Sequence, residues 1–359
     1  MPIPEVELLD QKLVIFGAGS LGRTVFAALR SAGTCPLAFC DNNSSLWGTA
    51  IEGVAVMSPA QAALQFPDAV FVVAIWHPST SEGLRHHVLF LRSLGCKQVI
   101  TFVPVMWRFP ETFLPNMFWE LPANILAERP AIDAARDLLD DHGKQEFDRQ
   151  FRFRTEGDPF SLQDPEPTPQ YFPPDFFRLS HQECFVDCGA FDGDTLAVFA
   201  EQTGGHFRRY IALEPEPANL AKLESTVAGN VVLRDRVTVH PYAVGGRREE
   251  LRFSSAGDGS GVSADGELIV QAVALDELLA DDTPTFIKMD IEGFELEALA
   301  GASGCIRRCR PKLAICVYHR PDHLWRIPLA IHELLPDSRM TMRSYQQDGR
   351  ETVCYCLPK

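Results

Sequence analysis

The chain has 359 residues, more than one ordinary hydrophobic core holds, so we expect two domains of about 100–200 residues each. Apolar residues make up 46% and charged residues 23%, which is typical of globular proteins. The net charge of -15 argues against a nucleic-acid partner, because phosphate binding needs a basic face. No apolar run spans a membrane and no signal peptide is evident, so we expect a cytoplasmic protein. The ten cysteines include no Cys-x-x-Cys and are expected to be reduced and mostly buried.

The first recognisable element is a strand over residues 12–16 that runs into a Gly-x-Gly-x-x-Gly turn and then a helix. Such glycines let the backbone approach a phosphate, and the helix amino terminus offers free N–H groups. A second strand, over residues 37–41, ends in an acid 22 residues after the middle glycine, where a dinucleotide fold binds the ribose. We therefore predict a Rossmann-like domain over residues 1–103. Its predicted nucleotide site comprises Gly17, Gly19, Gly22 and Asp41.

The role of this first domain stays open among three alternatives. The stretch over residues 41–59 resembles small Rossmann-like modules of sugar-modifying and sugar acyltransferase proteins, which bind nucleotide-sugars or serve as docking domains. The domain could thus bind a nucleotide or nucleotide-sugar, act in docking, or use a dinucleotide for redox chemistry. The nearby His77, His86 and His87 are expected to be surface or hydrogen-bonded residues rather than catalytic ones.

Residues 104–170 differ in composition and are predicted to connect two domains. The first part is rich in Phe, Trp and Pro. Residues 131–153 carry apolar side chains at helical spacing, which predicts a helix. Residues 156–174 are rich in proline and are expected to form an ordered, non-helical connector.

A second strand, glycine turn and helix begin at about residue 184. This strand ends in Asp187, and the next strand ends in Glu214, 27 residues later. A carboxylate at the second position accepts both hydroxyls of a ribose, and Asp187 or Asp192 can hold an ammonium group or an ordered water. Since these strand ends are acidic and no phosphate-binding lysine is evident, the sequence favours a sulfonium nucleoside as cofactor. The following strand, over residues 237–244, is expected to place Tyr242 and Ala243 near the adenine.

Two further strands bring candidate catalytic residues. The strand over residues 285–290 ends in Asp290, and the strand over residues 312–319 ends in His319. Ligands of open α/β sheets bind beyond the carboxyl ends of the strands, so we expect both residues to join Asp187 and Glu214 in one site. Structural packing alone does not explain why four strands end in ionisable residues, because burying unpaired carboxylates is costly. The small-residue segment 254–263 is either a lid over this site or a plain loop.

Several motifs in residues 171–359 resemble the FkbM family of methyltransferases. These motifs are Tyr171-Phe-Pro-Pro, Phe185–Thr195, Ala212–Pro217, Ile287–Glu295 and Val317–Pro328. The resemblance implies a class I methyltransferase fold, S-adenosylmethionine as donor, and O-methylation of sugars, glycans or polyketides. One departure is that Arg343 is followed by Ser344 where the family often has histidine, which puts the choice of acceptor in doubt.

The predicted site combines this resemblance with the strand-end pattern. The cofactor-binding residues are predicted to be Asp187, Gly189, Ala190, Asp192, Gly193, Thr195, Glu214, Pro215, Tyr242, Ala243 and Asp290. The catalytic residues are predicted to be His319, Asp290 and Glu292. His319 is the first choice as base, since its ordinary pKa near 6.5 suits neutral pH, and Asp290 is the second. The same three residues could instead hold Mg²⁺ to acidify a sugar diol. Glu295 and Glu297 are expected to be solvated or capping charges.

The sequence thus predicts two doubly wound α/β sheets and an S-adenosylmethionine-dependent O-methyltransferase acting on a sugar, glycan or related hydroxyl. One alternative is an NAD(P)- or nucleotide-sugar-dependent enzyme that uses the first domain. Another is a non-catalytic S-adenosylmethionine-binding protein. A nucleotide-sugar is a further candidate acceptor, and whether the chain forms a homo-oligomer stays open.

Overall fold

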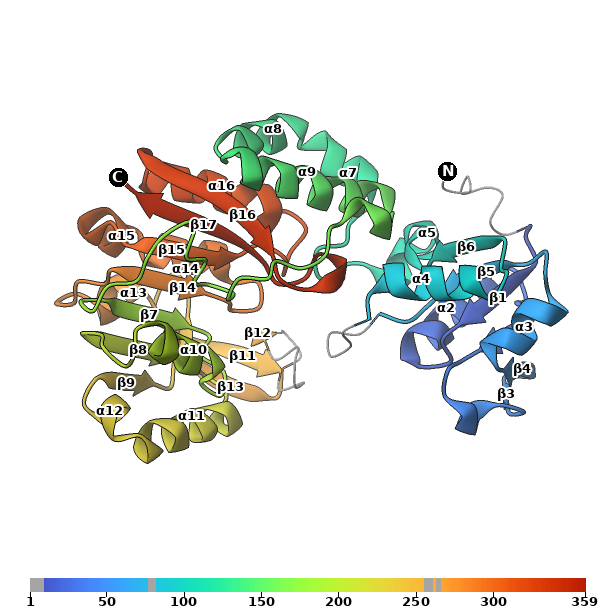
Figure 1. The fold of residues 1–359 in the computed structure, drawn as a ribbon, viewed down its shortest axis with the longest axis horizontal. Coiled ribbons are helices and arrows are strands. Elements are labelled where there is room, and N and C mark those ends of the chain that lie inside the picture. Colours follow the sequence, from blue (N-terminus) through green and yellow to red (C-terminus); the bar gives the residue numbers. More distant parts are fainter. Residues whose placement is uncertain (1–9, 77–81, 255–260, 263–265) are drawn as a thin grey trace. The chain divides into compact units, whose positions relative to one another are not determined.

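The computed structural model describes residues 10–76, 82–254, 261–262 and 266–359. The chain forms two compact units, and each unit collects more than one segment (Figure 1). Unit 1 comprises residues 1–127, 149–164 and 346–350, and unit 2 comprises residues 128–148, 165–345 and 351–359. The division differs from the predicted one, because residues 104–170 are shared between the two units instead of forming a separate connector.

Unit 1 is built on a six-stranded sheet with the order β3-β4-β2-β1-β5-β6. All neighbours in it are parallel except β3 and β4, which form a hairpin. The central strands β1 and β5 are apolar and buried at every position, as expected of parallel strands covered on both faces. The strands are β1 (Leu13–Phe16), β2 (Ala38–Cys40), β3 (Ala50–Ile51), β4 (Val54–Met57), β5 (Val70–Val73) and β6 (Gln98–Thr101).

The helices of unit 1 connect these strands in both directions along the sheet. Helix α2 joins β1 to β2, and α4 joins β5 to β6 the opposite way, so right-handed connections place the two helices on opposite faces. This confirms the predicted doubly wound architecture. The longer helical elements are α2 (Ser20–Ser31), α3 (Pro59–Gln65), α4 (Leu84–Ser93), α5 (Val103–Arg108), α6 (Pro110–Phe113) and α7 (Pro122–Ala127). Three short turns of 3-10 helix are η1 (Ser44–Leu46), η2 (Pro159–Ser161) and η4 (Gln347–Gly349).

The segment 346–350 belongs to unit 1 because its side chains are bound there. Both carboxylate oxygens of Asp348 accept the N–H of Leu84 at 3.0 Å, at the first turn of α4. Helix α4 has no side-chain cap of its own at Gly83, so Asp348 supplies the missing acceptor. Arg350 is buried, and its guanidinium carbon lies over the ring of Trp76, 5.4 Å from the ring centroid.

Unit 2 is built on a seven-stranded sheet with the order β16-β17-β15-β14-β7-β8-β9. The neighbours from β9 to β15 are parallel, and β17 runs antiparallel to both β15 and β16. The strands are β7 (Cys184–Cys188), β8 (Arg209–Leu213), β9 (Val237–His240), β14 (Phe286–Met289), β15 (Lys312–Cys316), β16 (Ser338–Ser344) and β17 (Thr352–Pro358).

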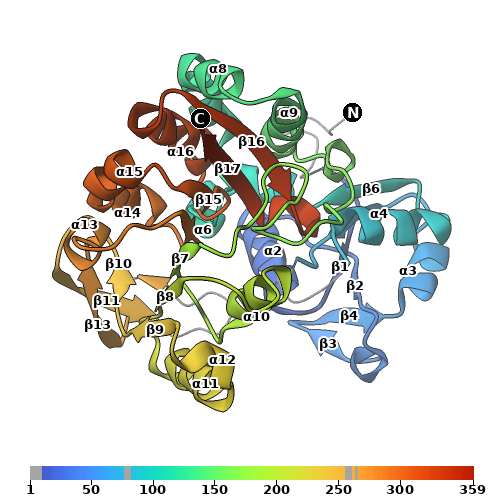
Figure 2. The same cartoon turned by 60° about the vertical axis from the view of Figure 1, so that its left-hand side comes forward.

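Helices cover both faces of this sheet (Figure 2). Helix α10 follows β7 on the way to β8, whereas α14 and α15 follow β14 on the way to β15, so the two sets lie on opposite faces. The helices of unit 2 are α8 (Arg129–Asp137), the first half of α9 (Asp141–Glu156), α10 (Asp194–Gln202), α11 (Pro217–Gly229), α12 (Val231–Arg234), α13 (Leu275–Leu278), α14 (Glu295–Gly301), α15 (Ser303–Cys309) and α16 (His323–Leu334).

The predicted strand over residues 237–244 is broken at Pro241. Only β9 joins the large sheet, while β10 (Ala243–Val244) pairs with β13 (Leu268–Val273) in a second, four-stranded sheet. That sheet is completed by β11 (Glu249–Ser254) and β12 (Gly261–Val262). Proline has no N–H to donate to a neighbouring strand, which accounts for the break. The predicted lid over residues 254–263 lies mostly outside the described residues.

The predicted helix over residues 131–153 is in fact two helices, α8 and α9. Leu139 pairs with Met340 of β16 between them. The carboxylate of Asp140 accepts the N–H of Gly143 at 2.9 Å and the hydroxyl of Thr341 at 2.7 Å. Asp140 therefore caps the first turn of α9 and binds β16, and apolar spacing does not reveal this role.

The structure confirms the prediction for the cysteines but not the prediction for every histidine. The ten cysteines are all free thiols and eight are buried, as predicted. His86 is exposed, but His87 is buried against Phe16 and neither of its ring nitrogens has a hydrogen-bond partner, so the prediction for His87 was wrong. His77 lies outside the described residues. No helix in the described part of the chain has the length and apolar character to cross a membrane.

Candidate active site

The four predicted strand-end residues lie along one edge of the large sheet in unit 2. The strands that carry them, β15, β14, β7 and β8, are consecutive neighbours in the sheet. Glu214 and Asp290 follow directly after β8 and β14, and His319 lies three residues after β15. Asp187 is the penultimate residue of β7. This is the edge at which open α/β sheets bind their ligands.

The turn after β7 requires its glycines. Gly189 has a φ of 81°, and a Cβ there would overlap the carbonyl oxygen of Asp290. The N–H groups of Gly189 and Ala190 both donate to the carbonyl of Leu213 at 3.0 Å, so the turn is fixed against β8. Gly193, with a φ of 94°, then leads into α10. The turn is therefore pressed between the ends of β8 and β14.

Glu214 holds this turn from the other side. Its carboxylate accepts the N–H of Phe191 at 2.9 Å and the N–H of Glu216 at 2.8 Å. The residue is only 5% exposed, and burial raises the pKa of Glu214 to about 7 despite these two hydrogen bonds. Each oxygen keeps one lone pair, which leaves acceptor capacity for the two hydroxyls of a ribose.

Asp187 lies beneath the turn. It is fully buried and accepts a hydrogen bond from the Tyr210 hydroxyl. Its carboxylate lies 3.0 Å from the ammonium of Lys288, which also donates to the carbonyl of Gly189 at 2.7 Å. Of the two residues predicted to hold an ammonium group, Asp192 is the one that is partly exposed. Sequence reasoning missed Lys288, although a lysine inside the apolar strand β14 was the available signal.

The other predicted cofactor residues lie near this edge at different depths. Thr195 is buried in the first turn of α10, and Pro215 separates Glu214 from α11. Tyr242 lies in the break between β9 and β10, with its ring stacked on His240 at 6.2 Å between ring centroids. Ala243 belongs to the small sheet. Their contact with a cofactor stays a prediction.

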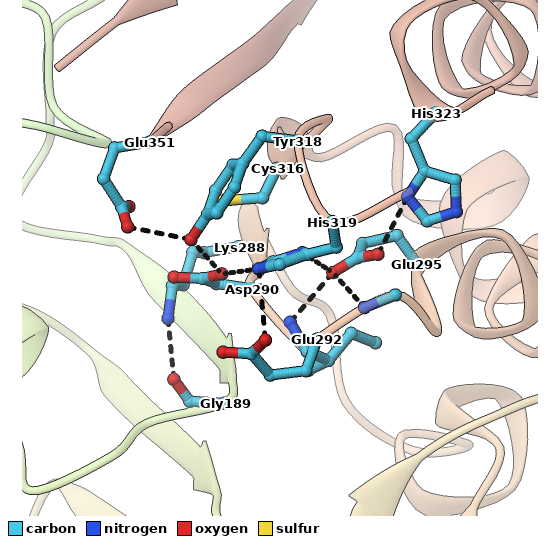
Figure 3. Close-up of polar contacts among 12 residues, drawn as sticks. Gly189, Lys288, Asp290, Glu292, Glu295, Cys316, Tyr318, His319, His323 and Glu351 are labelled. Carbon is cyan, nitrogen blue, oxygen red and sulfur yellow. Dashed lines mark hydrogen bonds and ion pairs between the residues drawn. The ribbon is translucent and has the colours of Figure 1, made fainter. Parts of the chain in front are cut away.

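His319 is surrounded by carboxylates (Figure 3). Its Nδ1 lies 2.8 Å from Glu295, while its Nε2 lies 3.3 Å from Asp290 and 3.7 Å from Glu292. Burial alone would lower the pKa of His319, but the three carboxylates outweigh burial and raise that pKa to about 10. The imidazole is therefore protonated at neutral pH in this structure, whereas the choice of His319 as base assumed its ordinary pKa.

Glu295 is not the solvated or capping charge that the sequence predicted. It is fully buried, and besides His319 it accepts the N–H of Ile291 at 3.0 Å and lies 3.1 Å from Nδ1 of His323. Burial would raise the pKa of Glu295, but the two histidines lower it well below its usual range. Glu295 is thus an ionised anchor for the imidazole, and the i, i+4 spacing of the two histidines was the signal for it. Glu297 is exposed, as expected.

Glu292 is the most exposed of the three carboxylates around His319. Its side chain is 39% exposed, against 22% for Asp290. Its φ of 55° is left-handed, which is rare for a residue with a side chain and directs Glu292 toward the imidazole from a tight turn. Burial in this acidic group raises the pKa of Glu292 to about 7.

Asp290 is also held by tyrosines that the sequence reasoning did not assign. The hydroxyl of Tyr171 donates to Asp290 at 2.8 Å, and the hydroxyl oxygen of Tyr318 lies 3.3 Å from it. Tyr318 donates to Glu351 at 2.8 Å, and the amide of Gln170 donates to the same carboxylate at 2.6 Å. Asp290 and Glu351 therefore form a polar wall on the opposite side of the site from Glu295 (Figure 3).

In unit 1, the structure brings the four predicted nucleotide-site residues together. Gly17 has a φ of 115°, and a Cβ on Gly22 would overlap the carbonyl of Gly17, so these two glycines serve the turn and the helix packing. A Cβ on Gly19 would meet nothing within 4 Å. The carboxylate of Asp41 accepts the N–H of Ala18 at 2.7 Å. At this turn Gly17 and Gly22 are packed against neighbouring atoms, whereas Gly19 has open space beside its Cα.

Comparison with known proteins agrees with this geometry. Residues 187–347 match the Methyltransferase FkbM domain. The chain is similar in structure to methyltransferase FkbM from Methylobacillus flagellatus KT, with 26% identity over 99% of this chain and 94% of that one and a TM-score of 0.78. Fibrillarin from Aeropyrum pernix, crystallised with S-adenosyl-L-methionine, is 11% identical over 50% of this chain and 69% of that one, with a TM-score of 0.33. UDP-D-quinovosamine 4-dehydrogenase from Vibrio fischeri is 23% identical over 25% of this chain and 76% of that one, with a TM-score of 0.22. No curated protein sequence matches the chain.

These findings confirm the fold class and the resemblance predicted from the motifs. The large sheet of unit 2, with its antiparallel β17, has the class I methyltransferase architecture.

Proposed function

We propose that unit 2 transfers the methyl group of S-adenosylmethionine to a hydroxyl of a sugar, glycan or related natural product. The observation that carries this proposal is the placement of Glu214, the glycine turn and the His319 group on neighbouring strand ends of an FkbM-type sheet. The non-catalytic alternative leaves the buried arrangement of His319 and Glu295 without a purpose, since buried charges cost stability.

The residues present fit S-adenosylmethionine. Glu214 has acceptor capacity for the two ribose hydroxyls, and Asp192 can receive the ammonium group of the methionine moiety. The glycine at position 189 lets the turn pack directly against the backbone of Asp290, which keeps Asp290 next to the turn. The carboxylates of Asp290 and Glu292 suit a ligand that carries a positive sulfonium.

The chain must then position the hydroxyl and receive its proton. S-adenosylmethionine supplies an activated methyl group: the O–C bond forms as the C–S bond breaks, and the electron pair of that bond stays on sulfur. Asp290 can take the proton of the hydroxyl through a carboxylate oxygen, whereas His319 can do so through Nε2 only after it has lost its own proton, which the surrounding carboxylates disfavour. Glu295 fixes the ring of His319 through Nδ1, which directs Nε2 to the site.

Titration calorimetry of the full chain with S-adenosylmethionine tests the cofactor. We expect binding in the wild type, loss of binding in Glu214→Ala, and unchanged binding in Glu224→Ala, a matched change at an exposed position on α11. No binding at millimolar cofactor would overturn the assignment. The acceptor class is tested with methyl-labelled cofactor and a panel of sugars and nucleotide-sugars. His319→Ala should keep cofactor binding and lose turnover.

For unit 1 we propose nucleotide or nucleotide-sugar binding at the Gly19 turn. The supporting observation is that Gly19 has open space in front of it, where the other two glycines of the motif are closely packed. Gly19→Val should fold normally but lose binding of UDP-glucose, measured by calorimetry. Binding of NADH instead of UDP-glucose would favour the redox alternative, and binding of neither would favour a docking role.

A further inference from the structure

A buried histidine of unit 1 has two ring nitrogens without hydrogen-bond partners. His87 lies in α4, is 4% exposed, and packs against Phe16 with 5.8 Å between the ring centroids. In the described part of the chain, neither Nδ1 nor Nε2 of His87 has a hydrogen-bond partner. Burial lowers the pKa of His87, so the imidazole is neutral at neutral pH and one nitrogen keeps its lone pair. Because a buried polar atom without a partner is costly, this nitrogen is suited to bind a ligand.

Two exposed residues place further ligand atoms near this nitrogen. Glu82 precedes α4, and His86 lies in the first turn of that helix. Nε2 of His86 lies 3.6 Å from a carboxylate oxygen of Glu82. One ligand atom each from Glu82, His86 and His87 lie within 4.8 Å of one another. Two imidazoles and one carboxylate thus converge, and the buried member of the cluster is neutral and unpaired.

We infer that Glu82, His86 and His87 bind a zinc ion at the start of α4. The inference goes beyond the proposed function, because the site lies in unit 1 and uses no residue of the candidate active site in unit 2. Two histidines and a glutamate are a known ligand set for Zn²⁺, with a water at the fourth position. Magnesium prefers oxygen ligands, so the two imidazoles favour a transition metal.

Small side-chain movements are sufficient to form the site. Ligands at about 2.0–2.1 Å from zinc lie about 3.4 Å from one another in tetrahedral geometry. The 3.6 Å between Glu82 and His86 is close to this value. These two side chains are 52% and 56% exposed, so both can turn toward the fixed ring of His87.

The backbone that carries the cluster is already ordered. The N–H of Leu84 donates to both carboxylate oxygens of Asp348 at 3.0 Å. The N–H groups of His86 and His87 donate to the carbonyl of Gly83 at 3.0 and 3.3 Å. An ion bound to three residues around this turn stabilises the start of α4, because it binds the folded turn and not the unfolded chain.

The experiment uses the full chain without a histidine tag, treated with a chelator and dialysed above the ordinary pKa of histidine. Calorimetry with Zn²⁺ and visible absorption with Co²⁺ should each show one site per chain. Binding should be at least tenfold weaker in Glu82→Gln and in His86→Gln. The controls Glu111→Gln, an exposed change on α6, and His206→Gln, an exposed histidine 5.3 Å from the ring of His181, should bind as the wild type does.

Absence of Zn²⁺ binding in the wild type, or equal affinity in Glu82→Gln and Glu111→Gln, would overturn the inference. The ten free cysteines are the competing ligands, since thiolates also bind zinc. Thiolate ligands give Co²⁺ an intense near-ultraviolet charge-transfer band, so such a band retained in both variants would assign the ion to cysteine and likewise overturn the site. Zn²⁺ should raise the melting temperature of the wild type and leave that of Glu82→Gln unchanged, and an equal rise in both would contradict a role at α4.

Discussion

Lowering the pH from 8 to 6 should weaken the binding of S-adenosylmethionine through Glu214. Because burial raises the pKa of this carboxyl to about 7, it is about nine-tenths ionised at pH 8 and about one-tenth ionised at pH 6. Only the ionised form accepts two ribose hydroxyls, so the apparent Kd should rise with the loss of that form. The expected change is about tenfold, or about 1.4 kcal/mol.

Calorimetric titrations at pH 6, 7 and 8 measure this effect. Glu214→Gln carries a neutral amide at every pH, so it should bind weakly and lose the pH dependence due to this site. Glu224→Gln is the control and should keep the full dependence, and any titration of the ligand itself would appear in all three proteins. The reasoning is refuted if the wild type has the same Kd at pH 6 and pH 8, or if Glu214→Gln keeps the tenfold change.

Two changes beneath the turn test what holds it. Lys288→Met leaves Asp187 buried without its cation, so urea unfolding should show a loss of about 3–5 kcal/mol in the free energy of unfolding. Adding Asp187→Asn should recover part of that loss, and no recovery would contradict the pairing of the two residues. Gly189→Ala should destabilise more than Gly204→Ala in thermal melting. Both positions have positive φ, which costs about 1–2 kcal/mol, but only Gly189 also packs against the backbone of Asp290, so equal losses would speak against this account.

The sheet edge could be predicted from the sequence because buried parallel strands have a recognisable sequence pattern. Continuous apolar runs such as those of β7 and β14 end in acids, and the right-handed crossover rule brings their carboxyl ends to one edge. Residues placed by that rule alone, including Glu214 and Asp290, lie where they were expected. The turn glycines were equally predictable, since their φ values depend on local geometry.

The interior of the site could not be predicted in the same way. Glu295 and Lys288 are charged residues whose burial depends on partners distant in sequence, and polarity alone predicts exposure for both. The pKa of His319 depends on three carboxylates that converge only after folding. Glu351 comes from the end of the chain and carries no strand-end pattern of its own.

The interleaving of the two units limits how this protein can be cut or recombined. The chain passes between them at residues 127/128, 148/149, 164/165, 345/346 and 350/351. A fragment ending before residue 346 would leave the first turn of α4 without the acceptor that Asp348 provides. Neither unit can therefore be moved to another protein by a single splice. A chimera that exchanges one unit needs a sequence junction at each of these five positions.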